Sequence, residues 1–395
     1  MYKKFENWLG NKKQNLSQRD YFLIKKAGDV ILGNVCAGEE FAWHPYRCIK
    51  PFKFPDGTEE WSNAIWNWDS AFHALGVMEW DTDLAKEQIL GFIRYQLEDG
   101  MFVDCVRRNG ETVCISSKPP VFSYASEQIY KKDGDLEFVK TVYPKLIENL
   151  EFWNNLRCYN GLYHYGANLS YSKYSELTRN INFESGWDNS VRWDNSCSDL
   201  WPIDLNCFMV MNYRSLSTLA GELGKTDESR FLSEKADELA KNINEYFWND
   251  SLKAYTDVDR FNFKPTDVLS PASFMPMFIG IAPPERAEFM AELAADKTKF
   301  FPGMPTVAYD NPNFSTDYWR GNTWFNVAYF AAKGLKNYGF NKTADAVKET
   351  LLGWVEKDGD CIHENYNSVT GEGLYCPKFS WSSVFVIEFI INWED

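Results

Sequence analysis

The lengths of the connections between predicted helices constrain this chain more than any other feature of its sequence. Apolar residues recur at spacings of three and four in about twelve segments, which is the period of a helix with one buried face. Strand-like alternation is scarce. The predicted helices span residues 20–34, 68–80, 82–98, 122–133, 135–156, 203–224, 227–248, 271–280, 283–296, 316–339, 341–357 and 379–392.

Short and long connections alternate between these helices. The short ones fall at Asp81, Gly134, 225–226, 282–283 and Phe340, and each joins two helices into a tight hairpin. The long ones separate the hairpins, and they span 35–67, 99–121, 157–202, 249–270, 297–315 and 358–378.

Five hairpins in series between two single terminal helices, with a long loop at every second connection, predict an all-α fold of the (α/α)6 barrel type. Six inner and six outer helices close a ring in such a barrel, and all the long loops emerge on one face. Loops gathered on a rigid scaffold suit an active site. No linker-like stretch divides the sequence and no repeat period indicates a solenoid, so we predict a single catalytic barrel domain over residues 1–395.

The formal net charge of −15 disfavours nucleic acid and anionic membranes as partners, because both bind clustered Lys and Arg. The N-terminal segment lacks the apolar core of a signal peptide, and no apolar run is long enough to cross a bilayer. We therefore expect a cytoplasmic protein. Its nine cysteines are scattered without a CxxC pair, which predicts reduced, packed thiols and neither a metal site nor a cofactor.

Aromatic residues make up 17% of the chain, including 16 Trp and 21 Tyr, and many stand beside Asn, Asp or Gly. A pyranose ring has an apolar face that stacks on an aromatic ring, and its hydroxyls need polar partners. The composition therefore favours a small carbohydrate as the ligand. The alternative is a core that is simply rich in tryptophan.

The longest predicted loop contains the strongest candidate for a catalytic acid, Asp188. Trp187 precedes it and can shield the carboxyl from water, which raises the pKa of a carboxyl toward the range needed for proton donation. Glu184 and Arg192 lie in the same short segment, and Arg192 is predicted to orient the motif or to meet the substrate. In the alternative interpretation, Asp188 caps a turn or pairs with Arg192.

A second carboxylate, Glu364, lies in the loop 358–378 between His363 and Tyr366. Hydrolysis of a glycosidic bond with inversion needs a second carboxylate that activates water on the opposite face of the sugar. Glu364 is the candidate for this general base, although it is also compatible with a purely structural role. Glu372 stands nearby between two glycines and is better explained as a solvated loop acid.

Two further loops combine aromatic and polar residues. One runs from Trp61 to Asp69 at the start of a predicted helix, where Asp69 could instead serve as a helix cap. The other lies before the tenth predicted helix and ends in the segment 317–326, where Arg320 stands between aromatics beside a glycine, as expected for a guanidinium aimed into a pocket. The alternative is a tryptophan-rich core helix with one structural arginine. The residues predicted to contact a sugar are Trp66, Trp68, Asp69, Trp187, Arg192, Tyr318, Trp319, Arg320, Trp324, Tyr366 and Trp381.

Four segments together resemble the clan of glycoside hydrolase families 63 and 37, which includes processing α-glucosidases, trehalases and mannosylglycerate hydrolases. ESGWDNSVRW at 184–193 is similar to the acid-bearing motif of trehalases and of the mannosylglycerate hydrolase group. WNWDSAF at 66–72 is similar to the early substrate loop, YWRGNTW at 318–324 to its family 63 counterpart, and HENYNSVTGEG at 363–373 to the base-bearing loop. The resemblance spans most of the chain, from about residue 60 onward.

The resemblance implies an inverting hydrolase of α-glycosides, with Asp188 as general acid and Glu364 as general base. It also implies that Trp68, Asp69, Trp319, Arg320 and Trp324 contact sugar. The length of the chain is similar to that of the compact mannosylglycerate and glucosylglycerate hydrolases. The segment GMFVDCV at 100–106 departs from their pattern, which tends toward a proline and a histidine there, so the sequence does not identify the sugar.

Two other function classes remain open at this point. Sugar epimerases and isomerases also use (α/α)6 barrels, but they generally rely on paired histidines. The four histidines here, His44, His73, His164 and His363, form no close pair in sequence. A carbohydrate-binding protein without activity is the other alternative, and the presence of both candidate carboxylates argues against it.

Overall fold

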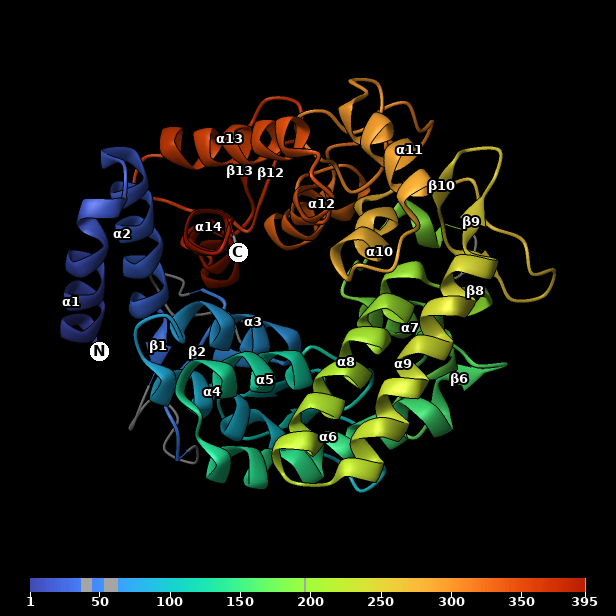
Figure 1. Cartoon of the computed structure of the whole chain (residues 1–395), viewed down its shortest axis with the longest axis horizontal. Coiled ribbons are helices and arrows are strands. Elements are labelled where there is room, and N and C mark those ends of the chain that lie inside the picture. The colour runs from blue at the N-terminus through green and yellow to red at the C-terminus, as the bar shows by residue number, and fades with distance from the viewer. Residues whose placement is uncertain (37–44, 53–62, 195–196, 395) are drawn as a thin grey trace.

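Six helices form the inner wall of the ring in the computed structural model of this protein, which describes residues 1–36, 45–52, 63–194 and 197–394. Each inner helix contacts the next, and the last contacts the first, so the ring closes. Figure 1 looks down onto this ring. The inner helices are α3 (Asn67–Val77), α5 (Phe122–Asp133), α8 (Ile203–Glu222), α10 (Met275–Phe278), α12 (Phe325–Asn337) and α14 (Ser380–Ile391).

An outer layer of helices surrounds this wall, as predicted for an (α/α)6 barrel. The outer helix α2, near the start of the chain, packs against the inner helix α14, near its end. In Figure 1 these two helices are the blue and red ribbons that lie side by side. The outer helices are α2 (Gln18–Gly33), α4 (Thr82–Ile93), α6 (Leu136–Leu156), α9 (Thr226–Tyr246), α11 (Pro284–Ala295) and α13 (Asn341–Lys357).

The two layers differ in how their sequences are buried. All eleven residues of α3 are buried, because this inner helix is covered on every side. On the outer helix α9 the buried residues are Leu232, Ala236, Leu239 and Ile243, whose spacings of four, three and four define one apolar stripe. The inner helix α3 is therefore covered on all sides, whereas the outer helix α9 is covered on one side only.

Short antiparallel strands occupy the long connections between hairpins. β3 (Ala64–Trp66), β4 (Cys105–Arg107) and β5 (Thr112–Val113) form a three-stranded sheet, with Ile65 opposite Val106. The remaining strands pair in twos and are β1 (Val35–Cys36), β2 (Cys48–Ile49), β6 (Cys158–Tyr159), β7 (Leu162–Tyr163), β8 (Leu200–Trp201), β9 (Trp248–Asn249), β10 (Ala254–Tyr255), β11 (Val258–Asp259), β12 (Asn365–Tyr366) and β13 (Gly373–Leu374).

The predicted helix over 316–339 is wrong in its first part, since α12 begins only at Phe325. Residues Tyr318–Arg320 form a single 3-10 turn in which Tyr318 has a left-handed backbone, with φ of 51°. The aromatic spacing in this segment reflects packing around a cavity and not a helix face. The segment 271–280 is likewise divided into a 3-10 turn over Pro271–Phe274 and the short α10.

Two helices were missed in the sequence, α1 (Tyr2–Lys12) and α7 (Leu177–Ser185). In α1 only Phe5 and Leu9 are buried, so its apolar signal is weak. None of the helices in the described ranges is both long and apolar enough to cross a bilayer. Seven of the nine cysteine side chains are buried, in agreement with the expected packed thiols.

Candidate active site

The long loops converge on a cavity of about 470 Å³ at one mouth of the ring. A wider cavity of about 730 Å³ adjoins it, and the two share Phe183, Asp188, Tyr318 and Glu364 as lining residues. We call these the inner and the outer cavity. The inner cavity is lined by Pro51, Ala64, Trp66, Trp68, Asp69, Asp104, Cys105, Arg107, Val113, Ile115, Lys118, Phe183, Gly186, Asp188, Tyr318, Trp319, Trp324, Glu364, Phe379 and Trp381.

Asp188 reaches the cavity from the turn that follows α7. This helix ends at Ser185, and Gly186 then takes a left-handed backbone with φ of 74°. A Cβ atom at Gly186 would clash with the ring of Trp68, so the turn requires glycine. The Ser185 hydroxyl accepts a hydrogen bond of 3.0 Å from the backbone N–H of Trp187, which fixes the turn that presents Asp188.

Burial raises the pKa of Asp188 to about 7, although its side chain keeps some exposure through the cavity. The positive charge of Lys118 opposes this rise, and the negative charges of Asp104 and Glu364 add to it. A carboxyl with this pKa carries a proton in a large share of molecules near neutral pH. Asp188 therefore has the protonation state of a general acid.

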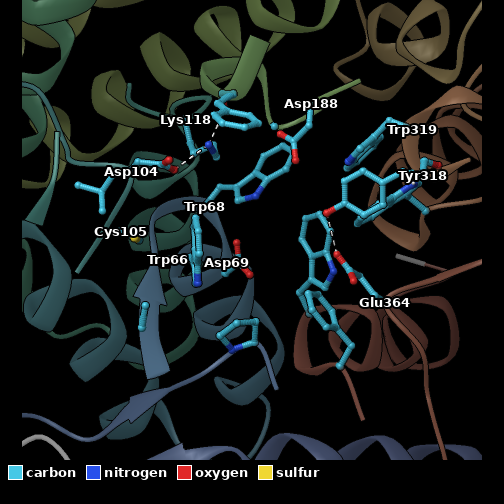
Figure 2. Close-up of a pocket in the computed structure, with 18 of the residues that line it drawn as sticks. Trp66, Trp68, Asp69, Asp104, Cys105, Lys118, Asp188, Tyr318, Trp319 and Glu364 are labelled. Atoms are coloured by element: carbon cyan, nitrogen blue, oxygen red, sulfur yellow. Dashed lines mark hydrogen bonds and ion pairs between the residues drawn. The ribbon is translucent and has the colours of Figure 1, made fainter. Parts of the chain in front are cut away.

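Glu364 enters the cavity from the loop before β12, and the residue is 6% exposed. The Tyr318 hydroxyl donates a hydrogen bond of 3.0 Å to Glu364 Oε1, and the backbone N–H of Cys376 donates one of 3.4 Å to Oε2. Burial raises the pKa of Glu364, whereas these hydrogen bonds act to lower it because they favour the ionised form. Asp188 and Glu364 both point into the space between the labelled aromatic residues in Figure 2.

Tryptophans form one wall of the inner cavity. Trp319 and Trp324 stack with ring centroids 3.8 Å apart and planes 9° apart. Trp381 contacts both Trp324 and Trp68, with centroids 5.6 Å and 5.2 Å away. The flat aromatic faces can stack on the apolar face of a pyranose, and the neighbouring carboxyls can accept hydrogen bonds from its hydroxyls.

Asp69 lies in the first turn of α3 and is 7% exposed. Burial raises the pKa of Asp69 to about 7, against the opposing charge of Lys118. Within the described ranges no Lys or Arg forms an ion pair with Asp69, Asp188 or Glu364. These three side chains, which we call the cavity carboxylates, are thus available to ligand hydroxyls.

A family model for the mannosylglycerate hydrolase MGH1-like glycoside hydrolase domain matches residues 62–382, which is most of the chain. This chain belongs to that family. It is a glycoside hydrolase, and every segment that lines the inner cavity after Pro51 lies within the matched range.

Individual relatives agree with this membership. A mannosylglycerate hydrolase of Thermus thermophilus is 26% identical over 82% of this chain and 93% of its own length, and one from Rubrobacter radiotolerans is 22% identical over 83% and 90%. The crystal structure of a GH63 mannosylglycerate hydrolase from Thermus thermophilus in complex with glucose has a TM-score of 0.75 to this hydrolase. It is 24% identical and covers 92% of this chain and 99% of its own, so it shows the same (α/α)6 barrel fold.

The structure brings most of the residues predicted from the sequence to the inner cavity of this hydrolase. They come from five different segments of the chain, and most of them are labelled in Figure 2. The predicted residues that line the inner cavity are Trp66, Trp68, Asp69, Asp188, Tyr318, Trp319, Trp324, Glu364 and Trp381.

Arg192 does not reach either cavity, which corrects the prediction that it meets the substrate. Its guanidinium donates paired hydrogen bonds to Asp204 and to Asp257, at 2.7 to 3.1 Å, and its side chain is 0% exposed. The alternative that it pairs with Asp188 is also wrong. Trp187 lies behind the cavity wall, 4.7 Å from the Arg192 guanidinium and 5.1 Å from the ring of Trp319, so it supports the wall without lining it.

Arg320 and Tyr366 also lie outside the two cavities. Arg320 forms an ion pair of 2.6 Å with Asp194, so its guanidinium is engaged by another residue of the protein and does not line the pocket that the sequence predicted. The Tyr366 hydroxyl donates a hydrogen bond of 2.8 Å to Asp358. Neither residue is positioned to touch a sugar in the inner cavity.

The two other acids of the sequence motifs have no place in the cavities. Glu184 pairs with Arg157 at 2.8 Å and is completely buried. Glu372 is exposed, in line with its interpretation as a solvated loop acid.

Sequence reasoning missed the charged residues Asp104 and Lys118 of the loop between α4 and α5. They lie within GMFVDCV and SSKPPV, where a single charge stands among apolar or small residues. A single charge inside an apolar segment could have indicated these residues, because a buried charge is usually paired or functional. Arg179, Asp317 and Tyr375 of the outer cavity were missed as well.

The three histidines in the described ranges do not form the pair that a sugar epimerase would use. His73, His164 and His363 bind Ser380, the Tyr165 carbonyl and Asp358, and none of the three lines either cavity. His44 and Trp61 lie outside the described residues. Across the described part of the chain, no group of three or more His, Cys, Asp or Glu is arranged to hold a metal ion.

Proposed function

We propose that this hydrolase cleaves an α-glycosidic bond with inversion, using Asp188 as general acid and Glu364 as general base. The observation that carries the proposal is the meeting of these two buried carboxyls, from loops far apart in sequence, at one aromatic cavity. Their surroundings differ in the way that the two roles require. The Glu364 carboxylate accepts hydrogen bonds from Tyr318 and Cys376, whereas for Asp188 the hydrogen bond that acts on its pKa comes from its own backbone.

In the proposed reaction Asp188 donates its proton to the glycosidic oxygen as the bond from that oxygen to the anomeric carbon breaks. Glu364 accepts a proton from a water molecule that attacks the anomeric carbon on the opposite face. The sugar leaves with inverted configuration, Asp188 is left ionised, and Glu364 is left protonated. Exchange of protons with solvent restores both groups. The residue types alone do not require a metal or a cofactor in this scheme.

The inner cavity suits the sugar, and Asp69 and the stacked tryptophans are its proposed contacts. The outer cavity suits the leaving group, because it adjoins Asp188 on the open side. Arg179 lines the outer cavity, its guanidinium lies 4.8 Å over the ring of Phe183, and it forms no ion pair with any of the described residues. A carboxylate on the leaving group would pair with it.

The relatives that are named mannosylglycerate hydrolases support glycerate as that leaving group. We therefore propose α-mannosylglycerate or α-glucosylglycerate as the substrate. Asp317 also lines the outer cavity, but its carboxylate accepts hydrogen bonds from Tyr375 and Asn189, which reduces its repulsion of an anion.

The test is a panel of α-mannosylglycerate, α-glucosylglycerate, α-mannosylglycerol and trehalose, with NMR detection of the anomer that appears first. We expect one of the two glycerate glycosides to be hydrolysed fastest, with the β-anomer of the sugar formed first. First release of the α-anomer would contradict inversion. Failure to hydrolyse either glycerate glycoside would contradict the proposed substrate.

The variant Arg179→Gln tests the leaving-group site. We expect kcat/KM for the glycerate glycoside to fall about fivefold, since an exposed ion pair contributes about 1 kcal/mol. The matched control is α-mannosylglycerol, which lacks the carboxylate and should be hydrolysed equally by both enzymes. An equal loss on both substrates would show that Arg179 does not recognise the carboxylate.

A further inference from the structure

The inner cavity contains a buried ion pair that the proposed reaction does not use. We propose that Lys118 and Asp104 form a positioning pair for Asp188. The pair anchors the end of the helix that precedes Asp188, and it balances the charge around the Asp188 carboxyl. The inference rests on the proposed function, because it takes Asp188 as the general acid.

The pair is held at the back of the cavity by short contacts. Lys118 Nζ lies 2.7 Å from Asp104 Oδ1, and the two side chains are 8% and 6% exposed. Lys118 Nζ also donates a hydrogen bond to the carbonyl of Phe183, in the last turn of α7. Figure 2 shows the pair beside Asp188 and Trp68.

This contact ties the loop of Lys118 to the turn that presents Asp188. The Phe183 carbonyl also accepts the hydrogen bond of 3.1 Å from the N–H of Gly186 that closes the turn. The backbone N–H of Ser117 donates one of 3.1 Å to Glu184, so two consecutive residues hold the same helix end. A cation at the carboxyl end of a helix meets the negative end of its dipole, which stabilises this arrangement.

The pair also determines the charge around Asp188. Burial lowers the pKa of Lys118, but attraction to Asp104 and Asp188 outweighs it and raises that pKa, so Lys118 stays positive. Its charge acts to lower the pKa of Asp188, while the charge of Asp104 acts to raise it. Asp104 thus offsets part of the effect of Lys118 on the pKa of Asp188.

In the inner cavity the other titratable or charged groups are two carboxyls, two neutral side chains and the cation Arg107, and in the outer cavity a second cation and a further acid join them. Lys118 is the cation whose charge lowers the pKa of both Asp188 and Asp69. The titratable or charged residues that line the two cavities besides the pair and Asp188 are Asp69, Cys105, Arg107, Arg179, Asp317, Tyr318, Glu364, Tyr375 and Cys376.

The test is an infrared titration of the protonated carboxyl band between about pH 5 and pH 9, in which subtraction of the same protein with Asp188→Asn isolates Asp188. Asp104→Asn should shift the loss of the Asp188 band to lower pH by about one unit, because Lys118 then acts unopposed. Lys118→Gln should shift it to higher pH. A side chain with only a structural role would not move the titration in opposite directions.

Lys26→Gln is the matched control. Lys26 is as buried as Lys118, at 7% exposure, and its Nζ donates to the Val355 carbonyl near the end of α13, but it lies outside both cavities. This variant should leave the Asp188 titration unchanged. If Lys118→Gln does not fold, the titration of Asp104→Asn tests the inference by itself. This variant should fold, since asparagine can still accept a hydrogen bond from Lys118.

Shifts in the same direction in both variants, or no shift beyond that of the Lys26 control, would overturn the inference. The proposed function is tested separately by turnover. If Asp188→Asn stays active, the assignment of the acid is wrong, whatever the titration shows. If Asp188→Asn is inactive and the titration does not move, only the positioning pair is wrong.

Discussion

The cavity carboxylates and the cluster around Arg192 are both buried groups of acids, and they differ in how their charge is balanced. Asp204 and Asp257 are each 2% exposed and share the Arg192 guanidinium through paired hydrogen bonds. Asp69 and Glu364 are buried and Asp188 is half-buried, and none of the three has such a partner in the described structure. A paired carboxylate stabilises the fold, whereas an unpaired one is left with a raised pKa and can exchange protons.

One member of each group lies in the same stretch of sequence. Asp188 and Arg192 stand within one short motif, and a reader of the sequence would assign both to the same site. The backbone turns between them, so that Asp188 enters the cavity and Arg192 enters the core. Proximity in a motif is therefore weak evidence for a shared function.

The largest expected effect comes from removing either proposed catalytic carboxyl. Asp188→Asn and Glu364→Gln should each lower kcat by about a thousandfold or more, as general acid–base groups contribute on this scale. Neither change removes an ion pair, so the melting temperature should not fall. Steady-state kinetics and calorimetry check this, with Glu372→Gln as an exposed control that keeps full activity. Near-normal kcat in either cavity variant would contradict the assignment.

Arg192→Met should instead lower the free energy of unfolding by about 3–5 kcal/mol, because it leaves two aspartates buried without a cation. Chemical denaturation measures the loss. Arg230→Gln is the control, since Arg230 is 67% exposed and its pair with Asp227 contributes little. An Arg192→Met protein that is as stable as the wild type but binds substrate more weakly would contradict this expectation. It would support the substrate contact that the sequence suggested for Arg192.

The pH dependence of stability should distinguish an unpaired from a paired carboxyl. Because the pKa of Asp188 is about 7 in the folded chain and near 4 when unfolded, the folded state holds the proton more tightly. This contribution is complete below about pH 4 and is lost as the pH rises through 7. Asp188→Asn should therefore gain stability over the wild type between these values.

The expected gain at pH 8 is about 2 kcal/mol, since the open cavity solvates Asp188 in part. Thermal unfolding of both proteins at pH 5 and pH 8 measures it. A constant difference between them at the two pH values would show that Asp188 titrates as an ordinary surface carboxyl.

The smallest effect is expected at Tyr318. Tyr318→Phe removes the hydrogen bond that favours ionised Glu364, so the pKa of Glu364 should rise and the acidic limb of kcat/KM should move to higher pH. The loss at the optimum should be about fivefold to tenfold, in line with one hydrogen bond to a charged group. An unmoved acidic limb would indicate that Tyr318 only packs against the cavity wall.

Much of the fold could be predicted because helix periodicity is a local property. The helices over 122–133 and 341–357 match α5 and α13 at both ends, and Gly134 provides the left-handed cap that the sequence suggested as a turn. The error before Phe325 arose because the aromatic residues of this segment are buried in a wall of stacked rings, such as Trp319 on Trp324, and not on a helix face. Local spacing does not distinguish these two causes of burial.

Most of the aromatic residues and three of the carboxyls that line the inner cavity could be predicted, whereas Asp104 and the cations could not. Lys118 was missed and Arg320 was misplaced, because the partner of each cation lies elsewhere in the chain or across a turn. The organisation as one domain over 1–395 stays a prediction.

The sequence by itself determined the ring and the two loops that carry Asp188 and Glu364, because hydrophobic periodicity and loop length are written along the chain. Only the tertiary structure decided which charges meet. Arg192 pairs with Asp257, and Lys118 pairs with Asp104 and donates a hydrogen bond to the end of α7, through contacts between distant segments. The balance of those charges separates the carboxyls that hold the fold from those placed to transfer protons.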